Sequence, residues 1–336
     1  MNRSAIITLA HGSGGQLSHE LIEGLFLRHL NNEALAELND AATVAVPSGQ
    51  IALTTDSFVV SPLFFPGGDI GRLAVCGTVN DLAVTGAQPK YLCAGLIIEE
   101  GLPFETLEQV VVSMAETARE AGVQIVTGDT KVVGRGAADG LFINTTGVGI
   151  HPLALGPRRL RPGDVLLVNG TLGDHGIAVL IRREGLSFDA PLVSDCAPLN
   201  DLIAALLAAC PGDVHCMRDP TRGGLAATLN EWAWSAGVGI EVDEQALPIR
   251  ETVRSVCELL GFDPLYVANE GKVVIAVAPT AAERALATLR AHPLGRDAAI
   301  IGRVAEMHAG RVVLETLFGA HRLLSMPVGE LLPRIC

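Results

Sequence analysis

The sequence predicts an α+β fold of two halves, each built on an antiparallel or mixed sheet. With 336 residues, the chain is long enough for two domains of about 150 residues each. Hydrophobic residues supply 49% of the chain and aromatic residues only 4%, so two buried cores can form and they must be aliphatic. Helical patterns follow pairs of β-rich runs instead of every single strand, and this order argues against a doubly wound parallel sheet.

The first half contains both hydrophobic periods. Helical spacing covers residues 70–87, and it returns between Pro103, typical of a first helical turn, and Gly122, typical of a helix end. Four apolar or alternating runs are typical of strands: 53–60, 91–98, 124–127 and 141–150. Residues 151–163 are dense in Pro, Gly and Arg, as a connection would be, so we place a domain boundary near Gly156.

The second half contains the same mixture. We expect strands at 165–168, 238–242 and 272–277, and helices at 177–183, 199–209, 225–235 and 251–260. Pro327 and Pro333 discourage a helix or a central strand near the end of the chain. The expected organisation is therefore an N-terminal domain over 1–155, a C-terminal domain over 156–326 and a mobile tail over 327–336.

Charge and composition exclude several classes of partner. Lys and Arg total 24 against 37 Asp and Glu, a formal net charge of −13, which repels nucleic acid and anionic lipid. No run reaches the ~18 apolar residues of a membrane helix, and residues 1–15 lack the features of a signal peptide. The seven cysteines include no C-x-x-C pair, which favours reduced thiols over a zinc site. We expect a cytoplasmic protein without a nucleic-acid or membrane partner.

A glycine-rich segment, His11-Gly12-Ser13-Gly14-Gly15, stands just before a helical run that starts at Ser18. Backbone without side chains can surround phosphate oxygens near the start of a helix. The segment matches neither a Walker A motif nor a dinucleotide fingerprint. A flexible N-terminal loop is therefore the alternative interpretation.

Carboxylates stand beside small or polar residues at the expected ends of elements: Asp40, Asp56, Asp69, Asp81 and Asp129. Carboxylate oxygens suit magnesium, and a buried aspartate needs a partner such as a cation. Each of them also fits an exposed cap or turn, so both interpretations stay open. Lys131 would share a strand face with Asp129 and could stand beside a bound phosphate, or it could form a surface ion pair.

Three polar, glycine-bearing junctions mark the second half: 169–176, 218–224 and 269–272. Arg218 and Arg222 could form a fork for a carboxylate or a phosphate, and Glu270 could act as a general base. Each junction also fits a simple turn.

The chain ends on Cys336, whose thiol on a mobile segment could visit both an internal pocket and another protein. An incidental terminal cysteine is the alternative.

Together these segments resemble the HypE family of hydrogenase maturation factors. These are carbamoyl dehydratases in the superfamily of aminoimidazole ribonucleotide synthetase, selenophosphate synthetase and thiamine-monophosphate kinase. The resemblance to the ATP-binding half of the superfamily lies in Asp40, Thr55-Asp56-Ser57, residues 77–83 and Gly128-Asp129-Thr130-Lys131. The narrower family is indicated by residues 11–15, 65–71, 218–224 and 269–271 and by Pro333-Arg334-Ile335-Cys336. The resemblance spans nearly the whole chain.

The resemblance implies a PurM-like two-domain architecture. Its N-terminal, ATP-binding domain would pack a mixed sheet against a second copy in a dimeric barrel, and a C-terminal α/β domain would close over the site. ATP and Mg²⁺ would be the cofactors. A transferase, HypF, would load a carbamoyl group onto the Cys336 thiol, and this protein would dehydrate the S-carboxamide to an S-cyanide. The cyanide would pass to iron in the HypC–HypD complex, for a [NiFe] hydrogenase.

The resemblance also implies roles for single residues. Cys336 would carry the reacting group, Glu270 would remove its nitrogen protons, and Lys131 would orient the phosphoryl group or the carboxamide. Magnesium would be held by Asp40, Asp56, Asp81 and Asp129. ATP would contact Gly12, Gly14, Gly15, Asp56, Asn80, Asp81, Asp129 and Thr130. Two other functions stay open: a kinase or synthetase acting on a free small molecule, and a nucleotide-bound scaffold whose tail docks a partner.

Overall fold

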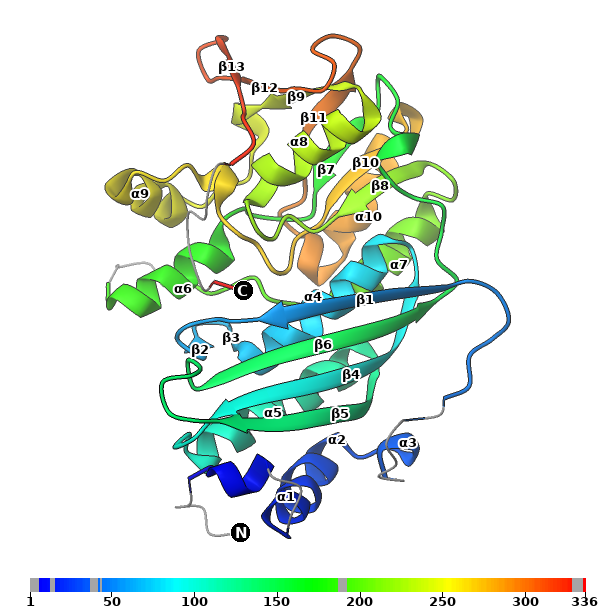
Figure 1. Cartoon of the computed structure of the whole chain (residues 1–336). Coiled ribbons are helices and arrows are strands. Elements are labelled where there is room, and N and C mark those ends of the chain that lie inside the picture. The colour runs from blue at the N-terminus through cyan, green and yellow to red at the C-terminus, as the bar shows by residue number, and fades with distance from the viewer. Residues whose placement is uncertain (1–5, 13–15, 37–41, 43, 187–191, 328–334) are drawn as a thin grey trace.

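The computed structural model describes residues 6–12, 16–36, 42, 44–186, 192–327 and 335–336 (Figure 1). Its first half comprises η1 (Leu9–Gly12), α1 (Gln16–Leu21), the π-helical η2 (Ile22–Leu27), α2 (Arg28–Leu30), α3 (Glu33–Ala36), β1 (Ile51–Phe58), β2 (Phe64–Phe65), β3 (Gly68–Asp69), α4 (Ile70–Val84), β4 (Gln88–Glu99), α5 (Phe104–Ala121), β5 (Gln124–Val133) and β6 (Leu141–Ile150). The second half comprises β7 (Val165–Val168), α6 (Asp174–Glu184), α7 (Asn200–Ala209), β8 (Val214–Arg218), α8 (Gly224–Ala236), β9 (Gly239–Asp243), α9 (Glu251–Leu260), β10 (Val274–Val277), α10 (Ala282–Ala291), β11 (Ala299–Ala305), β12 (Val312–Glu315) and β13 (His321–Leu323).

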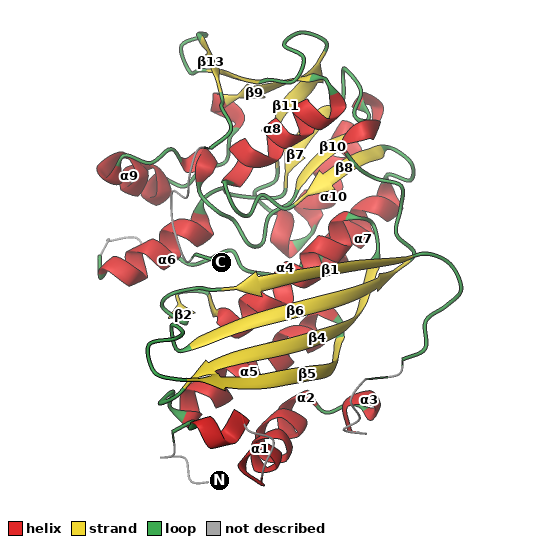
Figure 2. Ribbon diagram, in the orientation of Figure 1, coloured by secondary structure: helices red, strands yellow, loops and turns green. Residues whose placement is uncertain are grey.

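Each half is built on one main sheet (Figure 2). The first sheet has the strand order β1-β6-β4-β5, and the second has the order β13-β12-β9-β11-β7-β10-β8. Both are mixed, as predicted, because β4 pairs in parallel with β5 and β12 in parallel with β9, whereas pairs such as β1 with β6 and β7 with β10 are antiparallel. The α+β fold with mixed sheets is therefore confirmed.

The predicted elements are all present, with some shifts of their ends. The helix predicted between Pro103 and Gly122 is α5, and Gly122 ends it in the left-handed conformation with φ of 67°. The strand predicted at 124–127 is longer, because β5 continues through polar residues to Val133. This edge strand tolerates the polar side chains because one of its faces is open to water.

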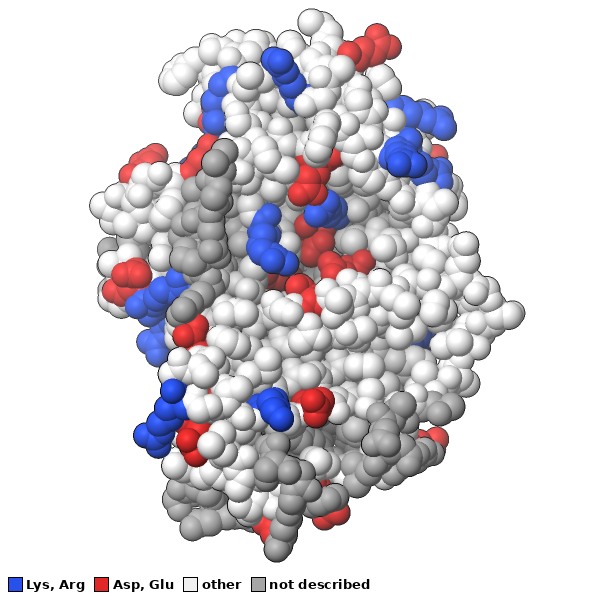
Figure 3. All heavy atoms as spheres, in the orientation of Figure 1, with Lys and Arg blue, Asp and Glu red and all other residues white. Residues whose placement is uncertain are grey.

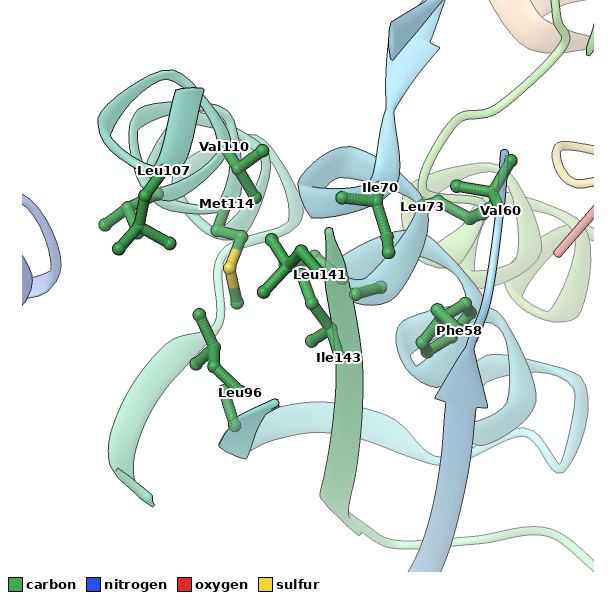
Figure 4. Close-up of a cluster of buried hydrophobic side chains, with 14 of the residues drawn as sticks. Phe58, Val60, Ile70, Leu73, Leu96, Leu107, Val110, Met114, Leu141 and Ile143 are labelled. Carbon is green, nitrogen blue, oxygen red and sulfur yellow. The ribbon is translucent and has the colours of Figure 1, made fainter. Parts of the chain in front are cut away.

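The core of the first half lies between its sheet and two helices. Leu107, Val110 and Met114 of α5 recur at helical spacing, and each is 0% exposed; together they cover the sheet at Leu141 and Ile143 of β6 (Figure 4). Burying each of these side chains contributes about 1.5–3 kcal/mol. The neighbouring helix α4 is buried on nearly all sides because it lies between β1, β6, α5 and the second-half elements α7 and β8.

The opposite face of the first sheet is open, and no layer of the described chain covers it (Figure 2). Side chains alternate along each strand, so on β1 and β4 this face is formed by odd-numbered residues such as Ile51, Leu53 and Ile97, which are all exposed. Exposed apolar side chains gathered on one face are typical of an interaction surface. Among the described residues, no helix has the length and apolar character that a membrane span needs.

Candidate functional site

Charged side chains gather in a hollow between the two halves, just above β1 (Figure 3). Asp56 stands near the end of β1, and Asp81 stands on α4, where it accepts a hydrogen bond of 2.8 Å from the Thr54 hydroxyl. Asp219 follows β8 directly and is buried. The Arg222 Nη2 lies 3.5 Å from Asp56 Oδ1. The structure therefore brings two of the predicted carboxylates together and adds Asp219.

Neighbouring negative charges disfavour the ionisation of Asp81 and Asp219. Burial, followed by the charge of Asp81, raises the pKa of Asp219 to about 7. Burial and the charge of Asp56 also raise the pKa of Asp81. A divalent cation would relieve this repulsion, so the chemistry of the donor set fits Mg²⁺. Within the described part of the chain, however, no three acidic, His or Cys side chains already stand close enough together to hold a metal ion.

Glu270 lies in the loop before β10, beside the same carboxylates. It is only 2% exposed, and its Oε1 has no hydrogen-bond partner among the described residues. Burial raises the pKa of the Glu270 carboxyl well above its ordinary value, and the nearby Cys196, Asp219, Asp195 and Asp56 raise it further. We call Asp56, Asp81, Asp219 and Glu270 the acidic cluster.

The last residue of the chain, Cys336, reaches this cluster. Its partly buried thiol lies beside the Glu270 carboxyl, and burial followed by the Glu270 charge raises the thiol pKa well above its ordinary value. The neighbouring Ile335 is 2% exposed and belongs to the hydrophobic core of the first half. The C-terminus accordingly lies between α6 and β1 (Figure 1). The structure thus brings together two of the predicted catalytic residues.

Several buried groups hold the Glu270 loop in place. The Glu270 N–H donates to Asp195 Oδ1 at 3.1 Å, and Asp195 forms a buried ion pair of 2.9 Å with Lys272. The Asn80 amide donates to the Glu270 carbonyl at 3.0 Å and to the Ala197 carbonyl at 3.1 Å. Asn80 therefore positions the Glu270 main chain, and its predicted contact with ATP stays a prediction.

Asp129 and Lys131 lie elsewhere, on β5. Both are exposed and both point to the open face of the sheet, as predicted for residues two apart on a strand. Asp56 points to the other face, because its Oδ2 lies 3.8 Å from the position of a Cβ on Gly77 of α4. Since β1 and β5 are opposite edges of the sheet, three inter-strand steps, about 14 Å, separate Asp56 from Asp129.

One protomer therefore does not assemble the four predicted magnesium ligands at one point. Asp56 and Asp81 are together, Asp129 is at the far edge, and Asp40 lies outside the described residues. Gly14 and Gly15 of the glycine segment also lie outside them, while Gly12 ends η1. Asp69, a carboxylate for which capping was the alternative interpretation, does cap α4 by accepting from the Gly71 and Arg72 N–H groups.

A cavity of about 350 Å³ lies between the β5 edge and the N-terminal helices. Its lining is apolar at Leu21, Phe26 and Ile125, and polar at Asp129 and Thr130. An apolar cavity with a few polar groups at its edge is typical of a small-molecule site. Two of the residues predicted to contact ATP therefore border a cavity of suitable size.

Sequence reasoning missed residues whose importance depends on tertiary contacts. Asp219 stands in the polar junction 218–224. Its place between Arg218 and Pro220 was the feature of the sequence that could have marked it as a site residue. His175 is 0% exposed, and its Nε2 is 2.9 Å from the Ile335 carbonyl oxygen. Lys272 stands in the junction 269–272, but its ion pair with Asp195 gave no local signal because the two residues are far apart in the chain.

Comparisons with known proteins find matches to both halves of the chain. Residues 38–151 match the family of AIR synthase related proteins, N-terminal domain, and residues 161–315 match the C-terminal domain of the same family. The carbamoyl dehydratase HypE of Escherichia coli is 56% identical, over 98% of this chain and 99% of that protein.

Solved structures match as well. The crystal structure of the hydrogenase maturation protein HypE in complex with ATP has a TM-score of 0.94 at 53% identity, covering 98% of this chain and 99% of that one. The HypE chain matched in a HypE–HypF complex has a TM-score of 0.80 at 50% identity, covering 91% of this chain and 99% of that one.

Proposed function

Since this chain belongs to the HypE family of carbamoyl dehydratases, we propose that it uses ATP to dehydrate an S-carboxamide on its own Cys336 to an S-cyanide. The observation that carries the proposal is the place of Cys336. The last thiol of the chain lies in the acidic cluster, where the charges of Glu270, Arg222 and Asp56 all act on it. An incidental terminal cysteine would not need this position.

The proposed reaction has two steps. The carboxamide oxygen attacks the γ-phosphorus of ATP, ADP leaves with the electron pair of the broken bond, and one nitrogen proton is lost. Loss of the second nitrogen proton then expels phosphate and forms the C≡N triple bond. Phosphorylation is needed because an amide oxygen is a poor leaving group. The net change is loss of one water from the carboxamide while ATP becomes ADP and phosphate.

The residues of the acidic cluster fit these steps. Glu270 receives the nitrogen protons, and a buried carboxyl with a raised pKa is suited to hold a proton during catalysis. Water is kept from the phosphorylated carboxamide because Glu270 is itself buried. Mg²⁺, with Asp40, Asp56, Asp81 and Asp129 as predicted ligands and Asp219 as a further one, would neutralise the charge of the triphosphate.

The nucleotide would lie between the glycine segment and the carboxylates. Gly12, Gly14 and Gly15 would surround the phosphates, and Thr130 and Asp129 border the cavity at the β5 edge that is large enough for a nucleoside. Lys131 stands two residues from Asp129 on the same face. It would orient the phosphoryl group or the carboxamide.

A homodimer would unite the two parts of this site. Asp129 and Lys131 lie on the open face of the first sheet, on the opposite edge and face from Asp56. Packing of that face against the same face of a second copy into a barrel would cover its exposed apolar side chains. It would also let Lys131 of the partner subunit approach the acidic cluster, which Lys131 of the same chain does not reach.

The proposal extends to organisation and partners. We assign residues 1–155 to ATP binding and dimerisation and residues 156–326 to the C-terminal domain of a cytoplasmic protein. Of the tail predicted over 327–336, residues 328–334 lie outside the described residues. HypF would supply the carbamoyl group, which is consistent with the known HypE–HypF complex. The HypC–HypD complex would accept the cyanide.

The decisive experiment is intact-mass measurement of the carbamoylated protein before and after Mg-ATP. We expect the tail peptide to lose the mass of one water, with ATP consumed in proportion. Cys336→Ser should abolish the loss, whereas Cys93→Ser, which removes another half-buried thiol, should leave it unchanged. An unchanged tail mass alongside ATP hydrolysis would contradict the proposal. ATP turnover that ignores Cys336→Ser and requires a free acceptor would favour a small-molecule kinase.

A further inference from the structure

We infer that His175 is a positioning residue that docks the penultimate residue of the tail and so sets the Cys336 sulfur beside Glu270. In this arrangement the protein recognises its substrate as a chain end with an apolar residue before the reacting cysteine. The inference rests on the proposed function only for the identity of Cys336 as the reacting group. The geometry of the dock is independent of it.

The first element of the dock is a hydrogen bond to the tail main chain. His175 stands in the first turn of α6, is 0% exposed, and lies with its Nε2 2.9 Å from the Ile335 carbonyl oxygen. Because a carbonyl oxygen only accepts, Nε2 must carry the proton and donate it. This contact involves the main chain, so it fixes the position of the tail whatever side chain precedes the cysteine.

The second element fixes the imidazole itself. Its Nδ1 lies 2.8 Å from Ser194 Oγ, which also accepts from the Cys196 N–H at 3.1 Å. The Ser194 hydroxyl therefore keeps its own proton to donate to Nδ1, and this selects the tautomer with the proton on Nε2. Burial lowers the pKa of His175 and keeps the ring neutral. The edge-to-face contact with Phe65, at 5.4 Å and 87°, fixes the plane of the ring.

The third element is the place of the Ile335 side chain. Ile335 is 2% exposed and belongs to the same buried hydrophobic cluster as Phe65 and Val179. Removal of an isoleucine side chain from water favours the docked tail. A polar side chain at this position would lose that contribution and would be left without a partner.

One short segment connects the dock to the base. Ser194 orients His175, and the adjacent Asp195 accepts from the Glu270 N–H at 3.1 Å and pairs with Lys272 at 2.9 Å. The segment packs closely against the Glu270 loop, because a Cβ on Gly271 would come within 1.8 Å of the Asp195 carbonyl oxygen. Residues 194 and 195 therefore fix the tail and the Glu270 main chain to the same few atoms.

The test is the alkylation rate of Cys336 in the full-length protein, with N-ethylmaleimide as the probe and mass spectrometry of the tail peptide as the readout. The side-chain amide nitrogen of glutamine can occupy the place of Nε2, whereas that of asparagine falls nearer Nδ1. In the His175→Asn and Ile335→Ser proteins, we expect Cys336 to be alkylated about five- to tenfold faster than in wild type. This factor corresponds to the loss of one hydrogen bond or of comparable apolar burial. His175→Gln should stay within about twofold of wild type.

The matched control is His215→Asn, which removes another buried histidine, one that is paired with Asp164 at 2.8 Å. It should leave the Cys336 alkylation rate unchanged. The inference would be overturned if Cys336 were alkylated at the same rate in all variants. It would also be overturned by equal Cys336 alkylation rates in His175→Gln and His175→Asn. Ile335→Ser tests the dock from the side of the tail if substitutions at His175 prevent folding.

A second readout separates this inference from the proposed function. In carbamoylated protein, His175→Asn should slow the ATP-dependent loss of water by about tenfold, and His175→Gln should restore most of the rate. Alkylation needs neither ATP nor a carbamoyl group. If wild type never loses water but the alkylation pattern holds, the proposed function fails and the dock stands. If wild type loses water but the alkylation pattern is absent, only the dock fails.

Discussion

Glu270 is a carboxyl group kept out of water, with one oxygen that has no hydrogen-bond partner among the described residues. Its main chain is held by Asn80 and Asp195, while its side chain faces the Cys336 thiol. Main-chain anchoring of this kind fixes a side chain without using up its proton-accepting atoms. The residue is therefore positioned for proton transfer and not for structural pairing.

We predict that Glu270→Gln abolishes dehydration and leaves ATP binding intact. Glutamine preserves the shape and the main-chain contacts but cannot accept the nitrogen protons, so the rate of water loss should fall about 10²- to 10⁴-fold. Single-turnover kinetics on carbamoylated protein would measure this, with ATP affinity determined in parallel. Glu241→Gln, which affects an exposed ion pair with Arg303, is the control. A near-wild-type rate in Glu270→Gln would remove Glu270 as the base.

Asp219 should make stability depend on pH. Its pKa in the folded protein is raised to about 7 from an ordinary value of 3.8. Between these values the folded state keeps the proton and the unfolded state does not, so the free energy of unfolding falls as pH rises from about 4 to about 7. This contribution is fully present below the lower value and lost above the higher one.

Asp219→Asn removes that dependence. Without divalent cations, we expect the Tm of Asp219→Asn minus that of wild type to be several degrees more positive at pH 7.5 than at pH 5, since 1 kcal/mol shifts Tm by about 2–4 °C in a protein of this class. Thermal unfolding at the two pH values measures this difference. Asp201→Asn, at an exposed position on α7, should show no such trend. A Tm difference independent of pH would show that Asp219 ionises normally in the folded protein.

At the scale of elements, the sequence predicts those whose own pattern determines them. The helix α5 has apolar residues at helical spacing and a glycine with positive φ at its end. By contrast, the strand β8 was not predicted from the sequence. Its His215 is buried in contact with Asp164, and a five-residue run does not reveal such a contact. The helix α10 was not predicted either. It buries Ala282, Ala285 and Leu289, and alanine gives a weak hydrophobic signal in a sequence.

The strand β5 depends on a glycine. A Cβ on Gly128 would come within 2.3 Å of the Ala94 carbonyl oxygen on β4, so Gly128→Ala must push the two strands apart. We expect a loss of about 1–3 kcal/mol in the free energy of unfolding and weaker ATP binding, because Asp129 and Thr130 follow directly. Gly134→Ala, where a Cβ meets nothing within 4 Å, should change stability by less than about 0.5 kcal/mol. Equal denaturant midpoints for the two variants would contradict this account of β5.

At the scale of the whole molecule, the sequence could list the site residues but could not place them. Asp56 and Asp81 meet because β1 packs on α4, which the order of elements along the chain makes plausible. Asp129 is far away because the strand order is β1-β6-β4-β5, and nothing in the neighbourhood of Asp129 encodes that order. Asp219 joins the cluster only through the contact between the halves, which pairs β8 with α4.

The open face of the first sheet leads to a prediction for the assembled molecule. If this face forms the dimer, a charge placed on it must be buried at the interface, which costs several kcal/mol and weakens association by a hundredfold or more. Leu53 on β1 is 66% exposed and points to this face. We therefore expect Leu53→Asp to be monomeric by light scattering at concentrations where wild type is dimeric.

The matched control is Leu259→Asp, because Leu259 is a leucine of similar exposure, 69%, on α9 of the second half. It should remain dimeric and keep its activity. In Leu53→Asp the loss of the dimer should also lower ATP-dependent water loss, because in the proposed dimer Asp129 and Lys131 would approach the acidic cluster from the partner subunit. A dimeric Leu53→Asp protein would exclude this face as the interface. A monomeric but fully active one would show that each protomer completes its own site, and Lys131 would then have no part in the reaction.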